Sequence, residues 1–527
     1  MISSRWVVCY LRVKTLEKVG VMLLNKGFQD ENNQRVGSAL PIWVQKFFDF
    51  LCCNKSKIFI IVVMILFITL TTIGVLHHEP WFDEAQAWLI AQDLGFGELL
   101  KYMKYEGHLF MWFLALMPSA KLHLTYPLPM LFTNVIFAWG AVYILLKKSP
   151  FHPILKVLIT FSLPIAYQYA VLARPYAMGV MFLFALAALY KDKLERPILY
   201  SILITLCANT SSMALCGAFA FGVIFLFDYI KSKKEFWKTK EFYTIFSIAT
   251  FCVAILGYQL LGADKKSAEL MTYYLYAKDT FNFFFSSAYN GVFFTFVNNI
   301  YYAYIFVGAL FILALFAFYK DKRTLFFFYF NYVLLTFIFT KLYNGYSWHH
   351  YFYFIYLVIS LWIFDKSKSN LWHKILIGLF SFSLIISVIS TFYSYQGDIT
   401  DRYTESKSVA DYIATHDKYK NANLVFCDEL SHSIVPYLKD KNIKTYNCEA
   451  KNNISFFNRK SGNSLQVSNT RLNPTYFNKF TDKDTYVVFY NGRYTKIKNQ
   501  YFDMDFEYCS EMGIDYTQYC IMKIKRK

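Results

Sequence analysis

Long apolar blocks recur along the chain from residue 58 onward, and they limit the possible folds more than any other feature. They are roughly 16 to 20 residues long, enough for a helix to cross the ~30 Å hydrocarbon core of a bilayer. Of the 527 residues 56% are hydrophobic and 17% charged, whereas a soluble domain carries about a quarter charged residues. The sequence therefore predicts a polytopic α-helical membrane protein with about 11–12 transmembrane helices.

The charges between the blocks predict which loops lie inside. The expected spans are 58–76, 127–146, 153–170, 175–190, 197–208, 213–230, 242–261, 300–318, 324–340, 351–364 and 375–392. With the N-terminus inside, the inner loops hold 17 Lys or Arg and the outer loops 7. Because basic residues resist translocation, this count predicts an N-in, C-out topology in the cytoplasmic membrane. The same clusters account for the net charge of +18, so no nucleic-acid partner is expected.

Two segments do not fit as spans. Residues 1–56 are mixed and basic, and we expect a cytoplasmic N-terminal leader. Residues 108–126 have a short apolar run that ends at Pro118, which indicates a short or re-entrant helix in the outer half. The spans and the loops between them form an expected transmembrane domain over 57–392.

The composition changes after residue 392. Residues 393–527 hold 20 Lys or Arg and 16 Asp or Glu, and they alternate helix-like and strand-like segments. We expect an extracytoplasmic α/β domain here. Its four cysteines, Cys427, Cys448, Cys509 and Cys520, can form two disulfides outside the cell or remain buried thiols.

The first outer loop, 77–107, gathers titratable residues. Trp81, Ala85, Trp88 and Leu89 follow a helical period, which predicts an amphipathic helix over 82–94 that lies flat at the membrane surface. Its first turn carries Asp83 and Glu84, which is also the pattern of ordinary helix capping by acidic residues. Further titratable groups precede and follow this pair in the sequence: His77, His78, Glu79, Glu106 and His108.

This pattern resembles the GT-C superfamily of multi-span glycosyltransferases that use polyprenyl-phosphate-linked sugars. The matching features are the Asp-Glu pair in the first outer loop, the Gly107-His108 pair before the next helix, and the motif YAVLARPYAMG over 169–179. The nearest likeness is to protein mannosyltransferases and to bacterial aminoarabinose or lipopolysaccharide-core sugar transferases. The resemblance implies that Asp83 is the catalytic base and that Glu84 beside it is an orienter or second acid.

A departing polyprenyl phosphate needs cations or hydrogen-bond donors for its growing charge. Arg174, in the quoted motif, offers a guanidinium fork that matches phosphate geometry, although an interfacial arginine also binds lipid headgroups generally. His349 and His350 lie in another outer loop, where two imidazoles can bind phosphate or simply sit at the interface. Glu106, His108 and Tyr176 complete the expected substrate-binding residues.

The sequence also departs from this family. Leu109 and Phe110 stand where relatives often carry a Pro pair, and no acidic residue follows Arg174. We therefore expect no obligatory metal or other cofactor, although a divalent ion at His77, His78, Glu79 and Asp83 is possible.

The function that this resemblance implies is an inverting glycosyltransferase that acts on the outer face of the membrane. Its expected partners are a polyprenyl-phosphate-linked sugar donor, membrane lipids, and an acceptor that is a glycan, a lipid-linked glycan, a cell-wall polymer or a protein. Two alternatives stay open: a polysaccharide transporter or flippase, for which buried charges in the spans are few, and a glycan polymerase.

Overall fold

The structure is a computed structural model that describes residues 57–232, 235–260, 280–294, 299–426, 428–447, 454–459, 477, 480, 483–490 and 502–526. The expected leader 1–56 lies outside the described residues, as do Cys427 and Cys448.

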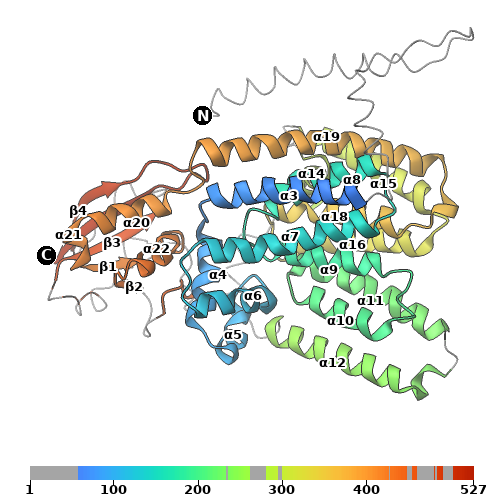
Figure 1. The fold of residues 1–527 in the computed structure, drawn as a ribbon, viewed down its shortest axis with the longest axis horizontal. Coiled ribbons are helices and arrows are strands. Elements are labelled where there is room, and N and C mark those ends of the chain that lie inside the picture. Colours follow the sequence, from blue (N-terminus) through green and yellow to red (C-terminus); the bar gives the residue numbers. More distant parts are fainter. Residues whose placement is uncertain are drawn as a thin grey trace, which may run out of the picture. The chain divides into compact units, whose positions relative to one another are not determined.

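Seven helices in this part of the chain are long and apolar enough to cross a membrane (Figure 1). They are α3 (Lys57–His77), α7 (Leu128–Lys148), α11 (Ser212–Ser232), α12 (Lys240–Leu260), α15 (Ile300–Phe318), α16 (Lys322–Lys341) and α19 (Leu371–Thr400). Each matches a predicted span to within a few residues, except that α19 continues eight residues beyond the predicted end at 392. Their length and composition are those of a multi-pass helical membrane protein.

Within the described residues, the other four predicted spans do not contain helices long enough to cross a membrane. Four predicted spans contain helices of only 8 to 13 residues: α8 (Pro153–Thr160), α9 (Tyr176–Ala188), α10 (Pro197–Ala208) and α18 (Phe352–Ile363). Helices α9, α10 and α18 match their predicted spans to within two residues, whereas the predicted span 153–170 is broken. Proline explains this break, because it lacks an N–H and favours the first turn of a helix. Pro164 thus begins a separate π-helix, η2 (Pro164–Gln168), within the predicted span 153–170.

Shorter helices form the remaining helical structure. The first outer loop and the segment after it contain α4 (Phe82–Asp93), α5 (Phe96–Tyr102), the 3₁₀-helix η1 (Met103–Tyr105) and α6 (Phe110–Lys121). The twelve residues of α6 extend ~18 Å, the same length as α10 and α18. Residues 262–299 were expected to be a loop, but α14 (Thr280–Phe293) lies within them and packs against α15, α17 (Ser347–His350) and α18.

Predicted outer loops contact other outer loops, and predicted inner loops contact residues near other inner loops. Among the predicted outer loops, the N–H of Ala173 donates to Glu84, and the hydroxyl of Tyr176, just past the loop 171–174, bonds His349. Among the predicted inner loops, Lys193 and Arg323 both pair with Asp228.

The C-terminal part contains a five-stranded sheet in the order β2-β1-β3-β5-β4. Strands β1 (Asn423–Phe426), β2 (Thr445–Asn447) and β3 (Thr485–Tyr490) are parallel, and β5 (Tyr519–Arg526) is antiparallel to β3 and β4 (Phe502–Cys509). Helix α20 (Ser406–Thr415), the 3₁₀-helix η5 (Leu430–Ile434) and α22 (Val435–Asp440) accompany them. The sequence pattern predicts helices within 406–417 and 432–441 and strands within 422–428, 443–448, 485–492 and 519–526, and each of these segments contains the predicted element, whereas β4 was not predicted.

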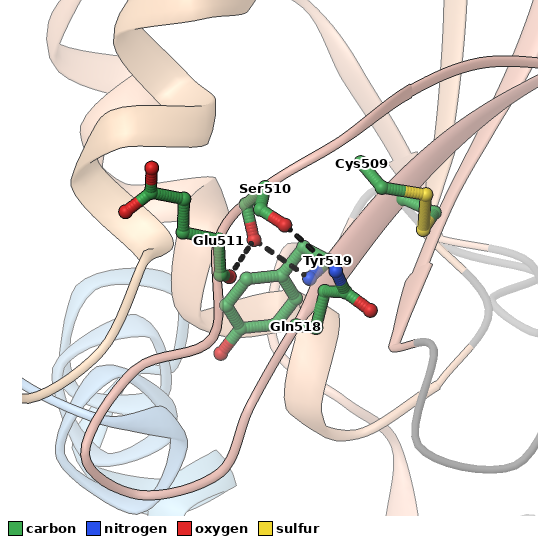
Figure 2. Close-up of a disulfide and its surroundings, with 6 residues drawn as sticks. Cys509, Ser510, Glu511, Gln518 and Tyr519 are labelled. Carbon is green, nitrogen blue, oxygen red and sulfur yellow. Dashed lines mark hydrogen bonds between the residues drawn. A yellow bond between two sulfur atoms is a disulfide. The ribbon is translucent and has the colours of Figure 1, made fainter.

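A disulfide joins Cys509 and Cys520, which face each other on β4 and β5 (Figure 2). Beside it, Ser510 N–H donates to the carbonyl of Tyr519 at 2.9 Å, and Tyr519 N–H donates to Ser510 Oγ at 3.1 Å. One of the two disulfides considered from the sequence is therefore formed.

Candidate active site

Helix α4 places Asp83 and Glu84 in its first turn, as predicted. Glu84 caps this helix, since its Oε2 accepts a hydrogen bond from the N–H of Trp81 at 3.1 Å. The prediction of an amphipathic helix at the membrane surface is wrong, because every residue from Glu84 to Ala91 is buried. Helix α6 and η5 of the C-terminal domain both pack against α4.

Glu84 connects three parts of the chain. Its Oε1 accepts from the backbone N–H of Ala173 at 2.6 Å, and its Oε2 lies 3.1 Å from His78 Nε2. His78 Nδ1 in turn lies 3.1 Å from Asp398 Oδ2 at the end of α19. Both carboxylate oxygens of Glu84 are thus engaged by protein groups.

Asp83 forms an ion pair with Arg174 through Oδ2 and Nη1. The other terminal nitrogen of Arg174 lies 2.6 Å from His108 Nε2. An arginine has only donors, so His108 accepts this bond and carries its own proton on Nδ1. The guanidinium also lies 5.7 Å from the ring centres of Trp81 and Tyr176, which adds cation–π attraction.

The backbone before Arg174 is fixed by one buried amide. Asn134 Nδ2, on α7, lies 2.9 to 3.1 Å from the carbonyl oxygens of Tyr169, Ala170 and Leu172. The chain turns here, after η2, and the turn directs Arg174 toward Asp83. Nothing in the sequence distinguished Asn134 from other polar residues within a span.

His349 joins the site through Tyr176, whose hydroxyl is 2.7 Å from Nε2 of the imidazole. The N–H of Tyr346 donates to His349 Nδ1 at 2.9 Å, so Nε2 carries the proton and donates to the tyrosine oxygen. His350 does not join the site: its Nε2 lies 3.1 Å from the carbonyl of Asn344, and its ring packs against Phe339.

Arg459 reaches the same site from the C-terminal domain. Its Nη1 donates to Glu106 Oε2 at 2.9 Å, and its Nε donates to Glu429 Oε1 at 2.9 Å. Its Nη2 pairs with Glu429 as well and lies 3.6 Å from Asp83 Oδ1. Asp83 thus has an arginine beside each carboxylate oxygen.

Burial and the two arginines set the protonation of the site. Burial alone would raise the pKa of Asp83, but Arg174 and Arg459 hold it below its ordinary value. Burial, together with Arg174, lowers the pKa of His108 to about 3, and the same two causes lower the pKa of His349. At pH 7 Asp83 is therefore ionised, and the imidazoles of His108 and His349 are neutral.

The described residues contain no group of three or more His, Cys, Asp or Glu side chains placed to hold a metal ion. The carboxylates of Asp83, Glu106 and Glu429 face arginine instead. His77 Nδ1 lies 2.8 Å from the carbonyl of Ile73 in its own helix.

The structure brings together seven of the eight predicted site residues, directly or through one neighbour, and leaves His350 apart. Sequence reasoning missed Arg459 and Glu429. A weak signal existed for Glu429, since it follows β1 at the carboxyl end of a parallel strand, where sites are common. Arg459 carried no such signal.

Comparisons with known proteins do not identify the chain: no protein-family model matches it. A search of curated proteins gives no significant match either.

Proposed function

We propose that the protein is an inverting glycosyltransferase. It moves a sugar from a polyprenyl-phosphate carrier to a glycan, lipid-linked, cell-wall or protein acceptor at the outer face of the cytoplasmic membrane. In this proposal the N-terminus is cytoplasmic and the C-terminal domain is extracytoplasmic. The sheet-bearing domain then covers the loops in which the reaction takes place.

The observation that carries the proposal is the placement of Asp83. Its side chain is 21% exposed, whereas that of Arg174 is 6% exposed. An accessible carboxylate with an arginine directly behind it offers a proton acceptor and an anion-binding group within one site. Glycosyl transfer from a phosphate carrier needs both of these groups.

The proposed reaction is a single displacement. The acceptor hydroxyl oxygen attacks C1 of the sugar from the face opposite the phosphate, and Asp83 takes the hydroxyl proton. The bond between C1 and the phosphate oxygen breaks, and its electron pair stays on that oxygen. The products are the glycosylated acceptor, with inverted configuration at C1, and the polyprenyl phosphate.

The ion pair between Asp83 and Arg174 suits this sequence of events. When the donor phosphate binds Arg174, the guanidinium interacts with both the phosphate and the Asp83 carboxylate, so it stabilises the charge of Asp83 less. The pKa of Asp83, which the arginine lowers, then rises, so the carboxylate becomes a stronger base when the donor is in place.

Two further observations support the proposed sidedness. The predicted inner loops carry 17 Lys or Arg against 7 in the outer loops. The disulfide between Cys509 and Cys520 belongs to the domain proposed to be outside, and disulfides persist in oxidising compartments.

The test is a mass-spectrometric comparison of surface glycans from cells that lack the protein, carry it, or carry Asp83→Asn. We expect one sugar to be missing without the protein and with Asp83→Asn. Glu98→Gln is the matched control, because Glu98 lies in the same loop, is exposed, and caps α5 through Gly95 N–H. This variant should retain the sugar.

Two outcomes contradict the proposal. If only the length distribution of a polymer changes, the protein is a polymerase. If complete glycans accumulate inside the cell, it is a transporter.

A further inference from the structure

Arg459 is the one cation that the C-terminal domain places beside Asp83 among the described residues. We infer that Arg459 is a second phosphate-binding residue, so that the donor phosphate is held between Arg174 and Arg459. This inference rests on the proposed function, because it assigns a further contact to the same donor. It makes the C-terminal domain a part of the active site.

A defined stretch of backbone places Arg459 in the site. Residues 454–459, called here the docking segment, lie along α4. Gln86 bonds both backbone groups of Phe457, at 2.8 Å to the carbonyl and 2.9 Å from the N–H. Asp93 accepts from Ser455 Oγ at 2.7 Å.

The three α4 residues that face this segment share one side of the helix. Asp83, Gln86 and Asp93 are spaced by three and seven residues, which a helix brings to one face. The N–H of Arg459 also donates to the hydroxyl of Tyr102 at 3.0 Å. The position of Arg459 is therefore set by α4 and α5 and does not depend on its side-chain ion pairs alone.

The guanidinium retains donors for a ligand. Of its five N–H groups, one on each nitrogen bonds Glu106 or Glu429. Two N–H groups, one on each terminal nitrogen, have no bonded partner among the described residues. One of them belongs to Nη2, which lies 3.6 Å from Asp83 Oδ1.

The exposed fractions of the side chains show which groups a ligand can reach. The side chains of Asp83 and Arg459 are 21% and 25% exposed, whereas those of Glu106 and Glu429 are 3% and 9% exposed. A phosphate that approaches Asp83 from outside thus meets Arg459 before it meets the two glutamates.

The glutamates hold Arg459 in a way that permits exchange. Burial raises the pKa of both Glu106 and Glu429, and Arg459 opposes this rise. A carboxylate of this kind takes up a proton readily when its arginine turns to another anion. Phosphate can therefore replace Glu429 on Arg459 without leaving an unpaired buried charge.

Direct binding to the purified full chain in nanodiscs tests the inference. The probe is radiolabelled farnesyl phosphate, with inorganic phosphate and phosphatidylglycerol as competitors to separate a prenyl phosphate site from a general phosphate or headgroup site. The variants are Arg459→Gln, Glu429→Gln and Lys439→Gln. Lys439 is the matched control, because it holds the same docking segment through Asp93 and Ser455, at 3.0 Å each, without facing Asp83.

We expect Arg459→Gln to weaken farnesyl phosphate binding about 10- to 100-fold, the usual effect of losing a charge-assisted contact. Lys439→Gln should bind within about twofold of the wild type. Glu429→Gln should bind about 3- to 10-fold more tightly, since it removes the carboxylate that competes for Arg459. If unlabelled farnesyl phosphate competes for the site and inorganic phosphate and phosphatidylglycerol do not, the result supports a prenyl phosphate site.

Three results would overturn the inference. Unchanged binding in Arg459→Gln removes this residue from the site. An equal loss in Lys439→Gln or Glu429→Gln shows that Arg459 acts only by holding the domain in place. Equal competition by phosphatidylglycerol shows general headgroup binding.

The binding experiment does not require sugar transfer, so it can fail or succeed separately from the comparison of surface glycans. If the surface glycans are unaffected by loss of the protein, the proposed function fails, yet Arg459-dependent binding of farnesyl phosphate still stands as a phosphate site. If the glycans respond as proposed and Arg459→Gln binds normally, only the inference about Arg459 fails.

Discussion

Glu84 Oε1 accepts a hydrogen bond from the N–H of Ala173 at 2.6 Å, next to the ion pair between Asp83 and Arg174. Two adjacent residues of the first outer loop are thus bound to two adjacent residues of the turn before α9. The contact between Glu84 and Ala173 is fully buried, whereas the ion pair between Asp83 and Arg174 is partly exposed. This difference separates the expected effects of the two acidic residues.

Glu84→Gln should destabilise the protein. It removes one charge from a buried ion pair with His78, a change that typically costs about 3 to 5 kcal/mol. Thermal unfolding in detergent measures the loss. A variant that unfolds at the wild-type temperature would show that the contact with Ala173 alone fixes the loop.

Asp83→Asn should abolish sugar transfer. The amide cannot accept the proton, so the rate should fall about 10²-fold or more; it also leaves Arg174 and Arg459 without the carboxylate between them, so some loss of stability is expected as well and turnover is measured on the folded variant. Turnover by the purified variant, with farnesyl phosphate binding as the check on the site, gives the answer. Wild-type turnover would exclude Asp83 as the base.

Arg174→Lys should be nearly as inactive as Arg174→Ala. An ammonium keeps the charge but loses the planar fork that contacts Asp83 and His108 together. We expect each variant to lose at least about tenfold in transfer rate. If the lysine variant retains full activity, Arg174 contributes charge alone.

The stability should fall between neutral and alkaline pH because of His78. Burial would lower the pKa of this imidazole, but Glu84 and Asp398 raise it to about 10 from 6.5. A raised pKa means that the ion pair stabilises the fold fully below about pH 6.5 and that this contribution is lost as the pH rises through about 10. The unfolding temperature of His78→Asn should depend less on pH across this range, and an equal dependence would contradict the assignment.

The proposed topology predicts which surfaces can be labelled in intact cells. A cysteine introduced at Lys420, an exposed residue of the C-terminal domain, should react with an impermeant reagent. One introduced at Asp192, among the predicted inner loops, should react only after permeabilisation. The reverse pattern would show that the C-terminal domain is cytoplasmic.

The sequence was sufficient for the long helices, because uninterrupted apolar blocks such as 58–76 and 300–318 leave few alternatives in a bilayer. It was insufficient where a local break decides the structure. Pro164 starts a π-helix within an apolar block, and α4 is buried on all sides although its composition resembles that of a surface helix.

The candidate site shows the same division. Asp83, Arg174 and His108 lie in motifs that a sequence can reveal. Arg459 and Asn134 act through tertiary contacts, with Glu106 and with the backbone of residues 169–172, and no periodicity or spacing marks such contacts.

The docking segment also affects when the site is complete during synthesis. Translation proceeds from the N-terminus, so the helices from α3 to α18 leave the ribosome long before residue 459. Until then Glu106 lacks the cation that pairs with it in the finished protein. The arrangement around Asp83 is therefore completed last, and under the proposed function a chain whose helices are already inserted in the membrane has only Arg174 to hold the donor phosphate until its final domain has folded.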